Sequence, residues 1–302
     1  MNLNMYIYTG SFAYNGKDSD YEVLTRLEKF TDLTKIVGGK FREDNRFYAN
    51  YTELNNTVLF ADKTTFCDIL YGKFPNKCYE LNQAFILIMS QGYLEKTDVT
   101  GNDIDNLITQ QAEKVCNAKV VLSRENVYKE GNYIVATYED WLSYRSFLLG
   151  KFPGEYISFY KECERYYENL VISKDYQKES QQVLRTHSSQ ICHILHCMNV
   201  YMFKELKEFK GSRIDFPRNF ARNHDIEDAS FEGNGKTKHK YLTMNFHCGK
   251  KVCEAHFKYN SINGCKHFND VRDCCRVYFS VPTIGDDKIY IGAILNHVRQ
   301  DN

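Results

Sequence analysis

The feature that most constrains the fold is one long stretch with helical spacing in the second half of the chain. Between Lys174 and Phe209, apolar residues recur every three or four positions, which is typical of a helix with one buried face. These positions are Val183, Leu184, Ile191, Leu195, Met198, Met202 and Leu206. Ser173 precedes the stretch as a candidate N-cap. A helix of this length must pack against other elements or a second subunit, so we expect it to form a central spine.

The region before this helix predicts a mixture of strands and helices. Residues 5–12 alternate and are rich in aromatic side chains, which favours a strand. Residues 21–37 have helical spacing and are followed by Gly38 and Gly39, which favours a helix ending there. Residues 47–54 and 56–62 resemble a pair of strands around Asn55 and Asn56.

The region after the helix divides into a polar segment and a strand-rich tail. Residues 211–240 contain glycines and a proline and show no sustained period, so we expect a linker or loop region. Strand-like runs follow at 241–246, 251–259, 274–281 and 288–295. The sequence therefore predicts an α+β chain with a mixed N-terminal region at 1–172, a long helix at 173–210, a linker at 211–240 and a small antiparallel C-terminal β-sheet at 241–302.

Charge, apolar runs and cysteine content together indicate the cellular compartment in which we expect the chain. The formal net charge is zero, so no global field draws the chain to nucleic acid or membrane, although the tail from Lys236 onward carries 11 Lys+Arg against 6 Asp+Glu. There is no basic and apolar leader and no apolar run near 18 residues. The 11 cysteines are odd in number and irregularly spaced. We therefore expect a cytoplasmic protein with reduced thiols and no membrane association.

Cysteine and histidine gather in the tail, which raises the alternative of a zinc site. Cys253 and His256 have the spacing of one ligand pair, and Cys265 with His267 offers a second. Adjacent cysteines on a strand point to opposite faces, so Cys274 and Cys275 make a poor pair. There is no C-x-x-C, and we expect no cofactor as the leading interpretation.

Alternation along the tail suggests a different chemistry. On a strand, Glu254, His256 and Lys258 share one face, and in the next strand Arg276 and Tyr278 share one. His297 follows the last strand. If these faces coincide, an imidazole could transfer a proton while the cations stabilise a phosphate. The alternative is a half-exposed sheet whose polar side chains are simply solvated.

Two further motifs have weaker implications. The run "GNGKTKHK" supplies Lys236, Lys238 and Lys240, which could bind phosphate although the spacing is not that of a P-loop. The run "CHILHC" at 192–197 falls on the long helix. It lacks the carboxylate of a metalloprotease helix, and we interpret it mainly as core with small thiols.

The tail also resembles two known groups of proteins. Its order "CEAHFKY … RVYFSVP … KIYIGAILNHV" is similar to the C-terminal end of a family of uncharacterised bacterial proteins with the pattern C-E-P-H-x-K-L, R-I-Y-F and I-x-I-G-H-I-G-x-H-L. The matching positions are Cys253, Glu254, His256, Lys258, Arg276, Tyr278, Phe279, Ile291, Gly292 and His297. The chain departs from the pattern at Ala293, Asn296 and Val298.

The strand order also resembles toxin ribonucleases of the RelE type, which implies an RNA-directed tail in bacterial toxin or phage-defence biology. The leading hypothesis is a metal-independent ribonuclease. His256 and His297 would be its acid–base pair, Lys258 and Arg276 would hold phosphate, and Tyr278 and Glu254 would assist.

The alternative is a non-catalytic protein-interaction module that assembles through the long helix, as a homo-oligomer or with a protein partner, and binds through the C-terminal sheet. Catalysis requires these side chains to converge on one cleft, whereas in a binding module they scatter or pair with Asp and Glu.

Overall fold

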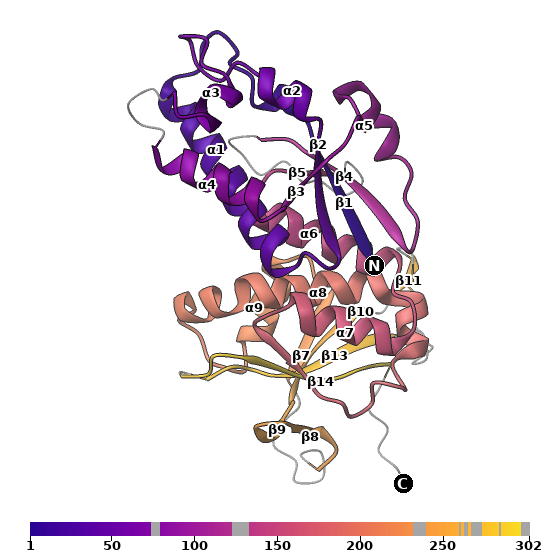
Figure 1. The fold of residues 1–302 in the computed structure, drawn as a ribbon. Helices are drawn as coiled ribbons and strands as arrows, with labels where there is room; N and C mark the ends of the chain where they lie inside the picture. The colour runs from indigo at the N-terminus through magenta and orange to yellow at the C-terminus, as the bar shows by residue number, and fades with distance from the viewer. Residues whose placement is uncertain are drawn as a thin grey trace. The chain divides into compact units, whose positions relative to one another are not determined.

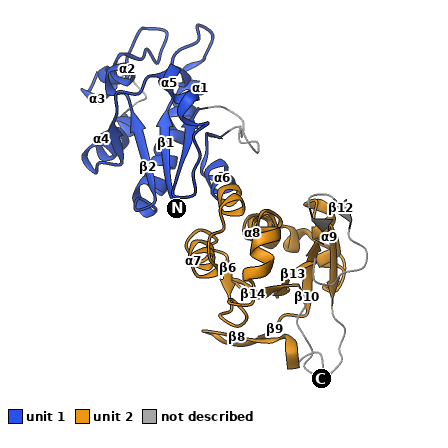
Figure 2. Cartoon of the chain, turned by 90° about the vertical axis from the view of Figure 1, so that its right-hand side faces the viewer, with its two compact units in different colours: residues 1–145 blue, residues 146–302 orange. Residues whose placement is uncertain are grey.

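The computed structural model describes residues 1–73, 79–122, 133–231, 240–259, 261–262, 265–266, 274–283 and 285–296. The chain forms two compact units, Met1–Arg145 and Ser146–Asn302 (Figure 2). Their boundary lies inside helix α6, Tyr138–Lys151, so the predicted N-terminal region at 1–172 extends into the second unit.

Unit 1 is built on a sheet whose strands are all parallel, in the order β3-β2-β1-β4-β5. The strands are β1 Asn2–Ile7, β2 Asn45–Ala49, β3 Leu94–Lys96, β4 Val115–Val120 and β5 Ile134–Val135. The accompanying helices are η1 Thr9–Ser11, α1 Asp20–Lys35, η2 Ile36–Lys40, α2 Tyr51–Asn56, α3 Phe66–Leu70, α4 Tyr79–Ser90 and α5 Gly101–Leu107. Helices join β1 to β2, β2 to β3 and β3 to β4, as in doubly wound α/β folds.

Local side-chain bonds explain where two of these helices begin. Ser19 and Glu22 form a capping box at the start of α1, close to the predicted helix. At α2, Asn50 Oδ1 accepts from the N–H groups of Thr52 (3.1 Å) and Glu53 (3.2 Å). This cap ends β2 and starts a helix, so the strand pair predicted at 47–54 and 56–62 does not form.

Unit 2 contains a five-stranded sheet in the order β6-β14-β13-β10-β7. Its strands are β6 Leu170–Ile172, β7 Asp228–Phe231, β10 Ala255–Tyr259, β13 Cys275–Ser280 and β14 Ile289–Leu295. Strand β6 pairs parallel with β14, and the other neighbours are antiparallel. Two small hairpins join β8 Thr243–Phe246 with β9 Gly249–Val252, and β11 Ser261–Ile262 with β12 Cys265–Lys266.

Helices cover one face of this sheet, and the β8–β9 hairpin lies on the other (Figure 1). The helices are α7 Tyr156–Tyr166, α8 Gln181–Glu208 and α9 Phe216–Asn223. The predicted long helix is α8, which begins seven residues after Lys174. Ser173 does not cap it: its hydroxyl donates to the carbonyl of Asn245 (2.9 Å) in the hairpin.

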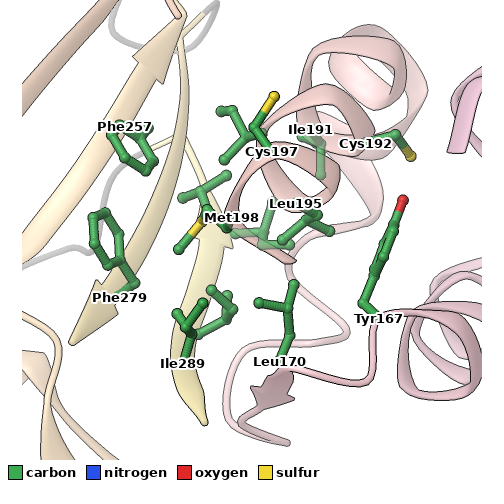
Figure 3. Packing of buried hydrophobic residues seen from close by; sticks show 14 of the residues in the cluster. Tyr167, Leu170, Ile191, Cys192, Leu195, Cys197, Met198, Phe257, Phe279 and Ile289 are labelled. Atoms are coloured by element: carbon green, nitrogen blue, oxygen red, sulfur yellow. The ribbon is translucent and has the colours of Figure 1, made fainter. Parts of the chain in front are cut away.

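The apolar side of α8 forms the core of unit 2. Ile191, Leu195 and Met198 pack toward Phe279 and Ile289 of the sheet (Figure 3). All five side chains are buried. The apolar stripe that predicted a central helix is therefore buried against the sheet of the same unit. Burial of each such side chain stabilises the fold by about 1.5–3 kcal/mol.

The expected linker at 211–240 contains regular structure in its described part. Helix α9 has Pro217 in its first turn and buries Phe216 and Phe220, while β7 adds a strand beside β10. Both elements are too short to show a sustained period. The α+β class is confirmed, with a long helix and antiparallel C-terminal strands. Among the described residues, no helix is long and apolar enough to cross a membrane.

Candidate functional site

Two neighbouring interior strands of the unit 2 sheet, β10 and β13, bring four of the predicted site residues together. In the antiparallel register of β10 and β13, His256 lies opposite Tyr278 and Lys258 lies opposite Arg276. The ring centroids of His256 and Tyr278 are 4.9 Å apart. Phe257, Val277 and Phe279 belong to the core beneath α8, so alternation places these four polar residues on the opposite face.

Cys253 does not lie in the α8 core with Ala255 and Phe257, although strict alternation through residues 253–257 would place the three side chains together. It belongs to a second cluster beneath the β8–β9 hairpin, with Met244, Tyr278 and Ala293. The reason is that residues 253 and 254 lie between β9 and β10 and belong to neither strand, so the alternation is interrupted. The hairpin therefore covers the Tyr278 end of the candidate face.

The charged residues predicted for the site are paired within the unit. Lys258 Nζ lies 2.7 Å from Asp228 Oδ2, and Glu254 Oε1 lies 3.2 Å from Arg213 Nη1. Arg276 donates a hydrogen bond to the carbonyl of Asn296. Burial alone would raise the pKa of Asp228, but the bonds from Lys258 and from the Ala229 N–H outweigh it and lower that pKa.

The imidazole and the phenol are less accessible than the cations. His256 is 3% exposed and Tyr278 is 2% exposed, whereas Lys258 and Arg276 are half-buried. A buried ring pair of this kind contributes stacking and apolar contact, about 0.5–1.5 kcal/mol for aromatic pairs. In this structure the predicted acid–base residue is not at the surface.

The remaining predicted residues are only partly described. Lys236, Lys238, His267 and His297 lie outside the described residues, and Lys240 is exposed. Cys265 falls in β12, but its side chain is not described. Their roles as phosphate ligands or as a second catalytic histidine stay predictions.

The described members of the zinc alternative do not point to one centre. Cys253 packs among apolar side chains under the hairpin, and burial raises the pKa of its thiol, which disfavours the thiolate that zinc binds. His256 instead faces Tyr278. Across the described parts of the chain, no group of three or more His, Cys, Asp or Glu side chains is arranged to hold a metal ion.

The histidines of "CHILHC" have separate partners. His193 Nε2 is 2.7 Å from the carbonyl of His224, and His196 Nδ1 is 3.2 Å from Ser146 Oγ. The hydroxyl of Tyr167 in turn donates to Ser146 Oγ (3.0 Å). These long-range contacts have no signal in the local sequence pattern.

Sequence reasoning also missed a cavity at the outer edge of β6. It has a volume of about 490 Å³, within the roughly 300–1,000 Å³ of ligand pockets. Its walls come from β6, the end of α7, the turn after β6 and the hairpin: Glu164, Leu170, Val171, Ile172, Lys174, Asp175, Asn245, Phe246 and His247. A strand of three residues carries too little pattern to reveal such an edge.

No family model, no curated protein and no solved structure matches this chain.

Proposed function

We propose that the chain is a non-catalytic protein-interaction protein that binds its partner through the sheet of unit 2. The observation that carries this proposal is that the predicted site residues are paired or buried within unit 2. Lys258 is paired with Asp228 and Glu254 with Arg213, while His256 is buried. A face that performs acid–base chemistry needs these groups available to a substrate.

The same sheet offers a binding surface elsewhere. Strand β6 is an edge strand, and the cavity of about 490 Å³ opens along it. The long helix is a weaker choice for the partner surface, because its apolar side is already buried against the sheet. The proposal therefore assigns the partner to the β6 edge rather than to α8.

Site-specific photo-crosslinking tests this proposal. A benzophenone amino acid replaces Phe246 in the cavity wall, and in a matched chain it replaces Tyr201, which lies on α8 and is 40% exposed. In cells that produce the chain at its native level, we expect a discrete crosslinked protein from position 246 and none from position 201. A crosslink confined to position 201 would favour assembly through the long helix, and no crosslink from either position would remove the proposal.

A ribonuclease is the second candidate, and the cross-strand apposition favours it. His256 with Tyr278, and Lys258 with Arg276, place an imidazole, a phenol and two cations on one face. The Asp228 side chain is 48% exposed, so a phosphate can compete with it for half-buried Lys258. His256 would have to be uncovered before it could transfer a proton to RNA.

Induction in a bacterial host separates the two candidates. Wild type is compared with a His256→Ala/Arg276→Ala double variant, and growth and total RNA integrity are followed. RNA fragmentation and growth arrest by wild type alone, with both chains equally soluble, would establish the nuclease. We expect intact RNA with both chains.

A further inference from the structure

The backbone of β6 has hydrogen-bonding groups directed away from its neighbour. The carbonyl of Asn169 accepts from the Ile289 N–H (2.8 Å), and the Ser173 N–H donates to the Ile291 carbonyl (2.8 Å). In a parallel pair, alternate residues turn both backbone groups to the same side. The backbone N–H and C=O groups of residues 169, 171 and 173 therefore face β14. Those of Leu170 and Ile172 point to the outer side of the sheet.

Most of these outward backbone groups have no neighbouring strand among the described residues. The N–H of Leu170 donates to the carbonyl of Tyr167 (2.9 Å). The Leu170 carbonyl and both backbone groups of Ile172 lie on the outer side of β6, and both residues line the cavity. Among the described residues, no strand pairs with this edge. An extended peptide is the ligand whose donors and acceptors match such an edge.

The side chains around the cavity add a charge pattern. Lys174 is exposed just after the C-terminal end of β6, and exposed His247 also lines the cavity. Glu164 is exposed in the last turn of α7, the helix that leads into the N-terminal end of β6. The carboxylate of Asp175 is already bonded to the side chain of Asn245 (3.0 Å) and to its N–H (2.8 Å). The cavity therefore has an exposed positive charge, Lys174, at the C-terminal end of β6 and an exposed negative charge, Glu164, at the N-terminal end.

The cavity also has an apolar wall that is held in place. The ring of Phe246 packs edge-on against Tyr290, with centroids 5.1 Å apart, and half-buried Val171 lies beside the same cavity. These two side chains can contact one apolar residue of an added strand.

We infer that the β6 edge accepts an extended segment of the partner protein as a sixth strand. The segment carries an acidic side chain beside Lys174, an apolar side chain on Phe246 and a basic side chain toward Glu164. This inference rests on the proposed function and names the kind of partner segment it requires. Affinity comes from main-chain bonds to residues 170 and 172, and selectivity comes from the flanking charges.

A display library of random eight-residue peptides, selected on the full chain, tests the inference. The same selection is performed on Lys174→Glu and on the matched control Lys178→Glu, an exposed lysine outside the cavity wall. We expect wild type and Lys178→Glu to enrich peptides with one acidic and one basic end. Lys174→Glu should weaken those peptides by about two- to fivefold, the value of one exposed ion pair, and enrich basic residues at that position.

N-methylation then tests the backbone pairing. In the bound peptide, alternate backbone N–H groups point toward β6 and the others point away. N-methylation of the amides that point toward β6 should weaken binding of the best peptide at least about tenfold. N-methylation of the other amides should not weaken it. Failure to enrich any peptide, or binding unchanged by Lys174→Glu and by both methylation patterns, would overturn the inference. A crosslink at position 246 without peptide binding would leave the interaction function standing and remove only the strand-addition mode.

Discussion

The hydroxyl of Tyr167, the hydroxyl of Ser146 and the imidazole of His196 form a chain of polar contacts inside unit 2. The two distances are 3.0 Å and 3.2 Å, and Tyr167 and Ser146 are buried. Burial raises the pKa of Tyr167 well above its ordinary value, so its hydroxyl stays protonated and donates. Three elements, α6, the turn after α7 and α8, are thereby joined through single side chains.

Replacement of Tyr167 by Phe tests this contact. The change keeps the ring in the core and removes the donor to Ser146, so we expect unit 2 to lose about 1 kcal/mol in free energy of unfolding. Urea unfolding monitored by circular dichroism gives the value. Tyr21→Phe is the control, because Tyr21 is 77% exposed and should change stability by less than about 0.5 kcal/mol. Equal stability of wild type and Tyr167→Phe would show that the contact contributes nothing net.

The pKa of His196 makes stability depend on pH. Burial, and then the nearby His193 and His224, lower it from 6.5 to about 4. Between these values the unfolded chain binds a proton that the folded chain does not, so stability falls as pH drops from about 6.5 toward about 4. The loss from this group alone is on the order of 3 kcal/mol.

A His196→Gln variant isolates that contribution from the carboxylates, which titrate in both proteins. We expect the stability difference between wild type and variant to shrink by about 2–3 kcal/mol as pH falls from about 7.5 to 4.5. Parallel pH dependences for the two proteins would show that His196 does not titrate with an altered pKa.

The β8–β9 hairpin is held to unit 2 by contacts at several points. Asp175 accepts from Asn245, Ser173 donates to the Asn245 carbonyl, and Lys251 lies 3.6 Å from Asp286. Beneath it, Gly292 leaves no room for a side chain. A Cβ there would lie 2.6 Å from Cys253 Sγ and 2.8 Å from Met244 Cγ.

Gly292→Ala should therefore push the hairpin away from the sheet. We expect a loss of about 1–3 kcal/mol, typical of overpacking, and faster proteolysis within the hairpin. The added methyl should cost less in a Cys253→Ala background, which removes the nearest atom, Cys253 Sγ. A double-mutant cycle measures the coupling. Full additivity of the two changes would mean that the crowding is relieved elsewhere.

Strong local patterns made several elements predictable. The spacing at 21–37 corresponds to α1, although the helical backbone continues through Gly38 and Gly39 in η2 instead of ending there. The alternating runs correspond to β10, β13 and β14. Alternation also indicated that Arg276 and Tyr278 share a face. It could not indicate that Asp228 neutralises Lys258, because β7 is a short strand within a polar segment. Pairing between distant segments depends on register and packing, which local periodicity does not encode.

Across the whole chain, α6 belongs to the cores of both units. Its first part serves unit 1, where Trp141 donates to Asn45 (3.0 Å) and Tyr144 to the Asn117 carbonyl (2.8 Å). Its last part serves unit 2, where Leu149 is buried in the core and the Gly150 carbonyl accepts from Ser188 (2.6 Å). A fragment that starts or ends at the boundary between the units would therefore divide α6 and remove part of the core of one unit.

This shared helix predicts how fragments behave. A fragment of residues 138–302 keeps all of α6 and should fold with the circular dichroism of unit 2. A fragment of residues 152–302 lacks Leu149 and Ser146, which costs about 2–5 kcal/mol for the lost side chain and about 1–3 kcal/mol for the stranded Tyr167 hydroxyl. That sum is comparable to the 5–15 kcal/mol stability of an ordinary domain, so we expect the shorter fragment to be largely unfolded or molten. Urea unfolding and near-ultraviolet circular dichroism compare the two. Equal midpoints would mean that α6 contributes to unit 1 alone, which would place the working boundary of unit 2 after residue 151.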